Sequence, residues 1–265
     1  MFFIETAQEL QLELEKIKKW EHEQKDLWFW EKLGRIPFKI LDKVTPTFIQ
    51  NKMLQVIDEL GRYVQSGGKY LIDEKAVVQR VFKSSATSYS LTEVASLPLE
   101  QLDEAATHYQ QARRRFATLQ GATTGIGGLF TLGLDIPMLV GLSLKTLQEI
   151  ALCYGYDPND PAERLFIIRC LQFASSDIVG KTAILNELTA TDQERNREAL
   201  SQIQGWREVV ITYRDQFGWK KLFQLVPVAG ILFGAFVNQS MIQDVAEAGR
   251  MLYRKRRILE RLQTI

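Results

Sequence analysis

Apolar residues recur every three or four positions along most of this chain, and strict alternation of apolar and polar residues is almost absent. The first spacing places apolar side chains on one face of an α-helix, whereas alternation is typical of strands. Near the N-terminus one such stripe lies among many Glu and Lys residues: Leu10, Leu14, Ile17 and Trp20. The pattern predicts an all-α multi-helix bundle, with residues 1–33 as an N-terminal amphipathic helix that docks on the rest.

Residues that begin helices support this fold class. Ser90 and Glu93 have the spacing of a capping box, in which each side chain accepts a hydrogen bond from the backbone of the other residue. A long polar helix is predicted to follow, from Pro98 to about Arg115. The last helix is predicted near residues 241–262.

A further helix start lies at 160-DPAERLF-166. Asp160 can cap this helix, Pro161 suits its first turn, and Glu163 is placed for reciprocal capping. This prediction matters for the segment 175-SSDIVGKT-182, which ends like a phosphate-binding loop. Such a loop follows a strand and needs a glycine where Ser175 stands, so we expect a break between two helices and no bound nucleotide.

Two apolar runs rich in glycine stand out, at residues 125–144 and 222–242. Each is long enough for about 30 Å of helix, and each contains a proline. In or beside these runs, glycines occur four residues apart: Gly121, Gly125, Gly230 and Gly234. Small residues at this spacing let two helix backbones approach closely, so the runs are predicted to form helical hairpin segments with close helix packing.

Asp135 and Asn238 are the polar residues of interest within these runs. Asp135 lies two residues before Pro137, where it is predicted to cap a helix that starts after a break. An interhelical hydrogen bond is the corresponding prediction for Asn238. The alternative is an enzyme acting on a lipid or another apolar substrate, with Asp135 as its working carboxylate.

The glycine-rich elements GIGG and GLDIP within 125–137, the segment 154-YGYDPNDPAERLF-166 and the segment 227-PVAGILFGAFVNQSMIQDVAEAGR-250 resemble the EcsC family of bacterial proteins. That family takes its name from a gene beside those of an ABC transporter. The resemblance implies a mostly helical bacterial protein that acts at the membrane, with residues 34–265 as a single EcsC-like domain. It supplies no catalytic residues.

Composition narrows the possible partners. Lys and Arg number 33 against 32 Asp and Glu, a net charge of +1, so no basic excess points to nucleic acid. The two cysteines have no CxxC spacing, and His22 and His108 are the only histidines. The motifs of metal sites and of common hydrolases are absent from the sequence, so we expect no metal and no cofactor.

The membrane interpretation depends on energies. An Asp at the centre of a bilayer span costs about 2.5–3.5 kcal/mol, and each Leu, Ile, Phe or Val returns only about 0.3–0.6 kcal/mol. Two spans through the glycine-rich runs would therefore be marginal. Contact with the membrane surface is predicted instead for two clusters, one aromatic and one basic: Trp28, Phe29 and Trp30, and Arg113, Arg114 and Arg115.

Taken together, the sequence predicts a cytoplasmic, non-enzymatic protein, peripheral to the inner face of the membrane. Its glycine-rich segments would bind lipid or a membrane protein partner. A protein with two membrane spans is the alternative for its location.

Overall fold

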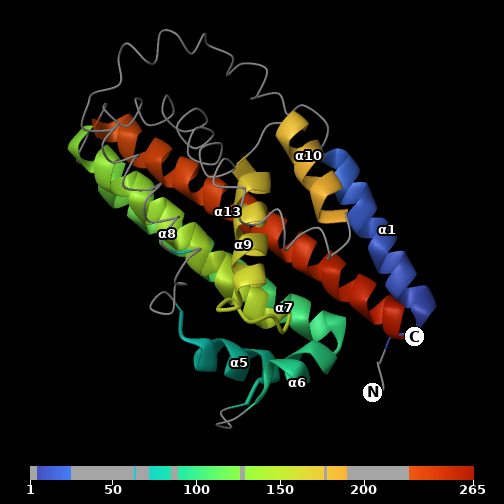
Figure 1. Ribbon diagram of the computed structural model, residues 1–265. Coiled ribbons are helices and arrows are strands. Elements are labelled where there is room, and N and C mark those ends of the chain that lie inside the picture. The colour runs from blue at the N-terminus through green and yellow to red at the C-terminus, as the bar shows by residue number, and fades with distance from the viewer. Residues whose placement is uncertain are drawn as a thin grey trace.

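The structure is a computed structural model, shown in Figure 1. It describes residues 5–24, 63, 72–84, 89–125, 129–175, 178–189 and 227–265. Of residues 123–125, 129–137, 175, 178–180, 187–189 and 227–237, it describes the backbone alone. Throughout these ranges the regular structure is helical, with no strand, so the all-α multi-helix prediction is confirmed.

Three long helices form the body of the protein: α7 (Leu99–Gly125), α8 (Leu129–Cys153) and α13 (Pro227–Thr264). They lie side by side, with α13 packed along α7 and also against α8 (Figure 1). At 1.5 Å per residue, the 38 residues of α13 extend for about 57 Å. The end of α7, the start of α8 and the start of α13 lie at one end of this layer, far from the C-terminus.

Shorter helices cover the layer. Helix α9 (Pro161–Ser175) crosses α8 and α13, and α10 (Ile178–Thr189) follows it (Figure 1). Helix α1 (Ala7–Glu23) lies along the C-terminal half of α13. Helices α5 (Glu74–Phe82) and α6 (Leu91–Ser96) pack at the start of α7 and the end of α8.

The capping predictions are confirmed at two helices. Ser90 Oγ accepts from Glu93 N at 3.2 Å, and Glu93 Oε2 accepts from Ser90 N at 2.6 Å, which begins α6. Asp160 Oδ1 accepts from Ala162 N at 2.8 Å at the start of α9. The reciprocal capping role of Glu163 is wrong. The Asp160 N–H donates instead to the Asp157 carbonyl at 3.0 Å, and the Glu163 carboxylate crosses to α13, where Tyr253 and Arg256 donate to it.

Helix α7 is longer than the sequence predicts. It continues past Arg115 to Gly125, ten residues further. Gln120 and Gly121 in this extension are buried, and α13 is the helix that packs most extensively on α7. Tertiary contact therefore maintains the helix where the local sequence, with its glycines and threonines, gives little helix propensity.

The prolines of the two glycine-rich runs behave differently. Pro227 begins α13, where its missing N–H costs nothing, in agreement with a break before the helix. Pro137 lies inside α8, which starts at Leu129. The capping role predicted for Asp135 is therefore wrong, because an N-cap lies outside the helix and Asp135 is in its interior. Its side chain lies outside the described residues.

Two apolar cores hold the helices together. The main core joins α5, α7, α8, α9 and α13 and includes fully buried Leu147, Ile167 and Ile242. A second, much smaller core lies under α1, where Leu10 and Ile17 are buried against α7 and α13. The apolar stripe predicted near the N-terminus is thus confirmed within α1. Residues 25–33, which the prediction included in the same helix, lie outside the described residues.

Candidate functional site

Arg113, Arg114 and Arg115 are consecutive on α7, but their side chains have three different surroundings. Arg113 Nε donates to Glu149 Oε2 at 2.7 Å, and this carboxylate on α8 is 2% exposed. Arg114 Nε lies 2.7 Å from the amide oxygen of Gln239 on α13 in the amide orientation that satisfies both groups. Arg115 is exposed. Of the three predicted membrane-contact arginines, Arg113 and Arg114 are hydrogen-bonded to neighbouring helices, and Arg114 and Arg115 are exposed to solvent.

The exposed face of α7 changes character along its length. Glu100 and Glu104 lie at its start, His108 and Arg115 follow, and Leu119 comes last, all on the solvent side. Residues spaced by three, four or seven positions share one helix face. This face is therefore acidic, then basic, then apolar, in the direction of the end that adjoins α8.

The apolar end of this face is unusually open. Leu119 is 69% exposed and Phe116, on the same part of the helix, is 49% exposed. Met138 on α8, the first residue of that helix whose side chain is described, is 50% exposed. Leu119 lies six residues before the end of α7, which corresponds to about 9 Å along the helix axis. Large apolar side chains exposed together are typical of surfaces that contact a partner or a membrane.

His108 lies in a positive electrostatic environment. Partial burial lowers the pKa of its imidazole, and the nearby charges of Arg80, Arg113 and Arg115 lower it further. Glu104, one helical turn before His108, forms an ion pair with Lys83 at 2.6 Å. The imidazole is consequently biased toward its neutral form near neutral pH.

The basic run at residues 254–257 on α13 is used for packing. Its side chains reach acceptors on four other segments: Arg254 to Asp103 and Glu13, Lys255 to Glu21, Arg256 to Glu163, and Arg257 to the Tyr154 carbonyl. The distances range from 2.6 to 2.8 Å. These cations connect α13 to α1, α7, α9 and the turn after α8, so they do not form a free basic surface.

Glu163 is the centre of the most buried of these contacts. It accepts from Tyr253 Oη at 2.6 Å and from Arg256 Nη1 at 2.8 Å. Burial raises the pKa of Glu163, and the charge of Arg256 together with both hydrogen bonds opposes this effect. The group is satisfied on both oxygens and fastens α9 to α13. Sequence reasoning missed this role because the partners lie about 90 residues away.

The remaining predicted site residues are the polar Asn238, the four glycines and the aromatic cluster at residues 28–30. Asn238 is fully buried on α13, and Gly121 is buried on α7. Gly125 ends α7, and Gly230 and Gly234 lie in the first turns of α13, with their surroundings outside the described residues. Their close packing stays a prediction. Trp28, Phe29 and Trp30 lie outside the described residues altogether.

The phosphate-loop motif falls at a helix junction. Helix α9 ends at Ser175 and α10 begins at Ile178, so Gly180 and Lys181 lie in the first turn of α10. Lys181 Nζ donates to Gln24 at 3.0 Å. The break predicted between two helices is present, although it precedes the glycine. Over the described ranges, no group of His, Cys, Asp or Glu side chains is arranged to hold a metal ion.

None of the described helices is both long enough and apolar enough to cross a bilayer.

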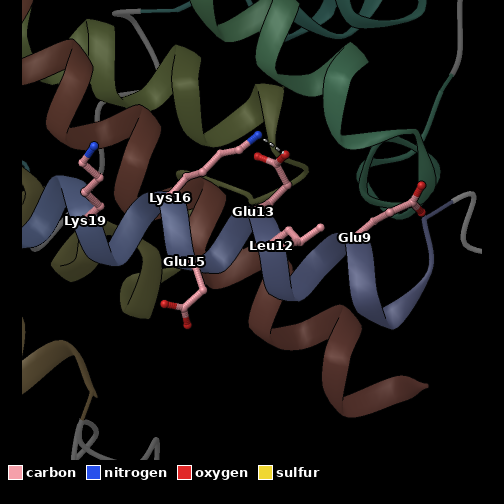
Figure 2. A pocket seen from close by; sticks show the side chains of 6 residues that line it. All are labelled: Glu9, Leu12, Glu13, Glu15, Lys16 and Lys19. Carbon is pink, nitrogen blue, oxygen red and sulfur yellow. Dashed lines mark hydrogen bonds and ion pairs between the residues drawn. The ribbon is translucent and has the colours of Figure 1, made fainter.

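A shallow depression on α1 contributes no site. Figure 2 shows its lining, which comes entirely from one helix: Glu9, Leu12, Glu13, Glu15, Lys16 and Lys19. Lys16 forms an ion pair with Glu13 at 2.6 Å, one turn away. A ligand there would meet side chains of a single exposed helix and no opposing wall.

The sequence of this chain is similar to those of known proteins. The EcsC protein family matches residues 11–258. The uncharacterized protein YdbA of Bacillus subtilis (strain 168) is 54% identical over 261 residues, which cover 97% of this chain and 96% of YdbA. Protein EcsC of the same organism is 27% identical over 186 residues, 70% of this chain and 76% of that protein. No solved structure matches this chain.

Proposed function

This chain belongs to the EcsC protein family, and from that premise we propose that it is a non-enzymatic protein bound peripherally to the anionic inner face of the membrane. The hairpin end of α7 and α8 points toward the lipid. Phe116, Leu119 and Met138 enter the outer part of the bilayer, and Arg115 lies at the level of the headgroups.

The order of side chains on α7 supports this proposal. An interfacial protein places apolar groups deepest, cations at the level of anionic headgroups and acidic groups away from them. The exposed face of α7 has this order, from Leu119 through Arg115 to Glu104. Arg115 and Leu119 are separated by about 6 Å along the helix axis. Apolar insertion of about 5–10 Å is typical of interfacial binding.

The energies suit reversible attachment. Full burial of a Leu or Phe side chain is worth about 1.5–3 kcal/mol, and a cation near an anionic surface adds about 1 kcal/mol. Phe116 and Leu119 are already partly covered by the protein, so each contributes less than this full value. A few such residues give binding that salt and mutation can reverse, unlike a membrane span.

Vesicle sedimentation with the purified protein tests the proposal. We expect Leu119→Gln to weaken binding to phosphatidylglycerol vesicles about tenfold, because about 1.4 kcal/mol of apolar transfer is lost. Leu12→Gln is the matched control, since Leu12 is 60% exposed on α1, away from the hairpin end. Equal binding of all three proteins, or equal loss in both variants, would refute the proposed orientation.

A further inference from the structure

Helix α1 and the C-terminal half of α13 meet along matching apolar stripes. On α1, Leu10 and Ile17 are buried seven residues apart. On α13, Met251 and Ile258 have the same spacing and belong to the same small core, which Leu99 of α7 completes. A seven-residue apolar spacing on both partners is typical of coiled-coil packing, the kind of contact that joins separate chains in coiled-coil oligomers.

Charged pairs flank this apolar seam. The three pairs are Glu5 with Arg261 at 2.7 Å, Glu13 with Arg254 at 2.6 Å, and Glu21 with Lys255 at 2.6 Å. Residues 5–24 carry six Glu against three Lys, and residues 250–264 carry six Arg and Lys against one Glu. Charges beside an apolar seam determine which helices pair and in which direction. This docking face of α13 therefore selects an acidic amphipathic helix.

The connection along the chain does not determine on which copy α1 docks. The hydrogen bonds that join α1 and its flanking residues to Leu99, Lys181 and Arg261 span 94, 157 and 256 residues of sequence. Residues 25–62, which lie outside the described residues, separate α1 from Tyr63. A chain of that length can reach about 125 Å at most, whereas the whole of α13 extends for about 57 Å. The docking face of a neighbouring copy is therefore within reach.

We propose that α1 is exchanged between two copies of this chain, so that the α1 of each copy docks on the α13 of the other. The two copies have identical surfaces, so every contact of α1 described above is repeated in such a dimer. A second copy also carries the matching carboxylates at the matching positions. The docking face lies toward the C-terminus of α13, away from the hairpin end of α7 and α8 (Figure 1). The dimer therefore requires no membrane.

Charge reversal at Glu21 and Lys255 tests the exchange directly, because both side chains are largely buried in their pair. Glu21→Lys and Lys255→Glu each place like charges opposite one another, both within one chain and in a dimer of a single variant. In an equimolar mixture, exchange of α1 between the two variants restores opposite charges at both docking faces. Size-exclusion chromatography with light scattering should show dimers in the mixture at a concentration at least tenfold lower than in either variant alone.

Two controls accompany the mixture. The double variant Glu21→Lys/Lys255→Glu restores the pair in every chain, so it should behave like the unmodified protein. Lys83→Glu mixed with Glu104→Lys is the matched control, because this ion pair at 2.6 Å joins α5 to α7 and neither helix is exchanged. That mixture should form no more dimer than its two components do separately. Circular dichroism verifies that each variant keeps its helices.

Limited proteolysis shows whether α1 is the element that joins the copies. It should be cut faster in each charge-reversed variant alone than in their mixture. The unmodified protein should form dimers as its concentration rises, and Leu10→Ala/Ile17→Ala should abolish them by removing the apolar seam.

Dimers in the charge-reversed mixture, with α1 protected, would support the exchange. A mixture no more dimeric than its components would overturn it, and so would an unmodified protein that is monomeric at every concentration. Both results would leave the docking face to the α1 of the same chain. Dimers that persist in Leu10→Ala/Ile17→Ala would reveal a different interface and would overturn the exchange as well.

Discussion

Arg113 and Arg115 show how two neighbouring residues of one type serve different purposes. Arg113 compensates the buried carboxylate of Glu149, whereas Arg115 meets solvent. Removing one partner of a buried ion pair leaves an uncompensated charge, which costs about 3–5 kcal/mol. Exposed substitutions usually change stability by less than about 0.5 kcal/mol.

We therefore expect Arg113→Gln to lower the free energy of unfolding by about 3 kcal/mol, with Lys145 at 3.8 Å from Glu149 limiting the loss. Arg115→Gln should leave stability unchanged and weaken binding to anionic vesicles. Urea unfolding and sedimentation measure the two effects. Equal stability of both variants would contradict the structural role of Arg113.

Gly155 provides a second test at the residue scale. It follows α8 with a φ of +79°, and an added Cβ would lie 2.8 Å from the backbone of Ala95 and of Leu91. Gly155→Ala should lower the free energy of unfolding by roughly 2–4 kcal/mol, because the backbone strain adds to the steric overlap of the new Cβ. Gly141, within α8, has no atom within 4 Å of such a Cβ. Gly141→Ala should leave the melting temperature unchanged or raise it. Thermal melts of the two variants measure both effects.

At the scale of elements, α1 is attached by a narrow set of contacts. Its antiparallel register on α13 is fixed at both ends, by Glu5 with Arg261 at 2.7 Å and by Trp20 Nε1 with Glu247 at 2.7 Å. Glu13 with Arg254 at 2.6 Å lies between them. The apolar core beneath Leu10 and Ile17 is small, and Trp20 of α1 packs against the main core. Helix α1, called the strap below, should therefore detach from the bundle at a lower free energy than the bundle needs to unfold.

The strap should release before the bundle unfolds. Leu10→Ala with Ile17→Ala removes most of its buried apolar contact, at about 2–5 kcal/mol for each residue. We expect limited proteolysis to cut this variant within α1 while the circular dichroism of the remaining helices persists. Leu12→Ala, on the exposed side, should leave α1 protected. Loss of all helical signal in the double variant would contradict an independently releasing strap.

The stability that the strap contributes should also depend on pH. Burial would raise the pKa of Glu13, but hydrogen bonds and charges from Lys16 and Arg254 outweigh it and lower the pKa overall. A carboxylate with a lowered pKa stabilises the folded state above its usual value of 4.5 and loses that effect as the pH falls through the folded value. Melts between pH 7 and pH 3 should therefore show a smaller pH dependence for Glu13→Gln than for the unmodified protein.

At the scale of the whole molecule, the peripheral proposal predicts how the protein leaves the membrane. High salt or alkaline carbonate should release much of it from cell membranes, because screening weakens the attraction between cations and headgroups. Immunoblotting of the washed fractions measures this release. Retention until detergent is added would contradict peripheral attachment.

Much of this architecture follows from the sequence because its causes are local. The spacing of apolar residues every three or four positions predicted the all-α class and the buried stripe of α1. Capping residues predicted the starts of α6 and α9. A helix is closed by hydrogen bonds within four residues, so nearby residues suffice to indicate it. The same holds for the family resemblance, which rests on short motifs.

Other features were decided by tertiary structure, because they depend on residues distant in the sequence. Packing on α13 extends α7 beyond Arg115 and places Asp135 inside a continuous α8, against the local signals of glycine and proline. Likewise, Arg113, Arg114 and Arg115 are equivalent in sequence, and only their angular positions on α7 relative to α8 and α13 determine which of them bonds to a neighbouring helix. A side chain's function depends on what packs against it, and that contact exists only in the folded protein.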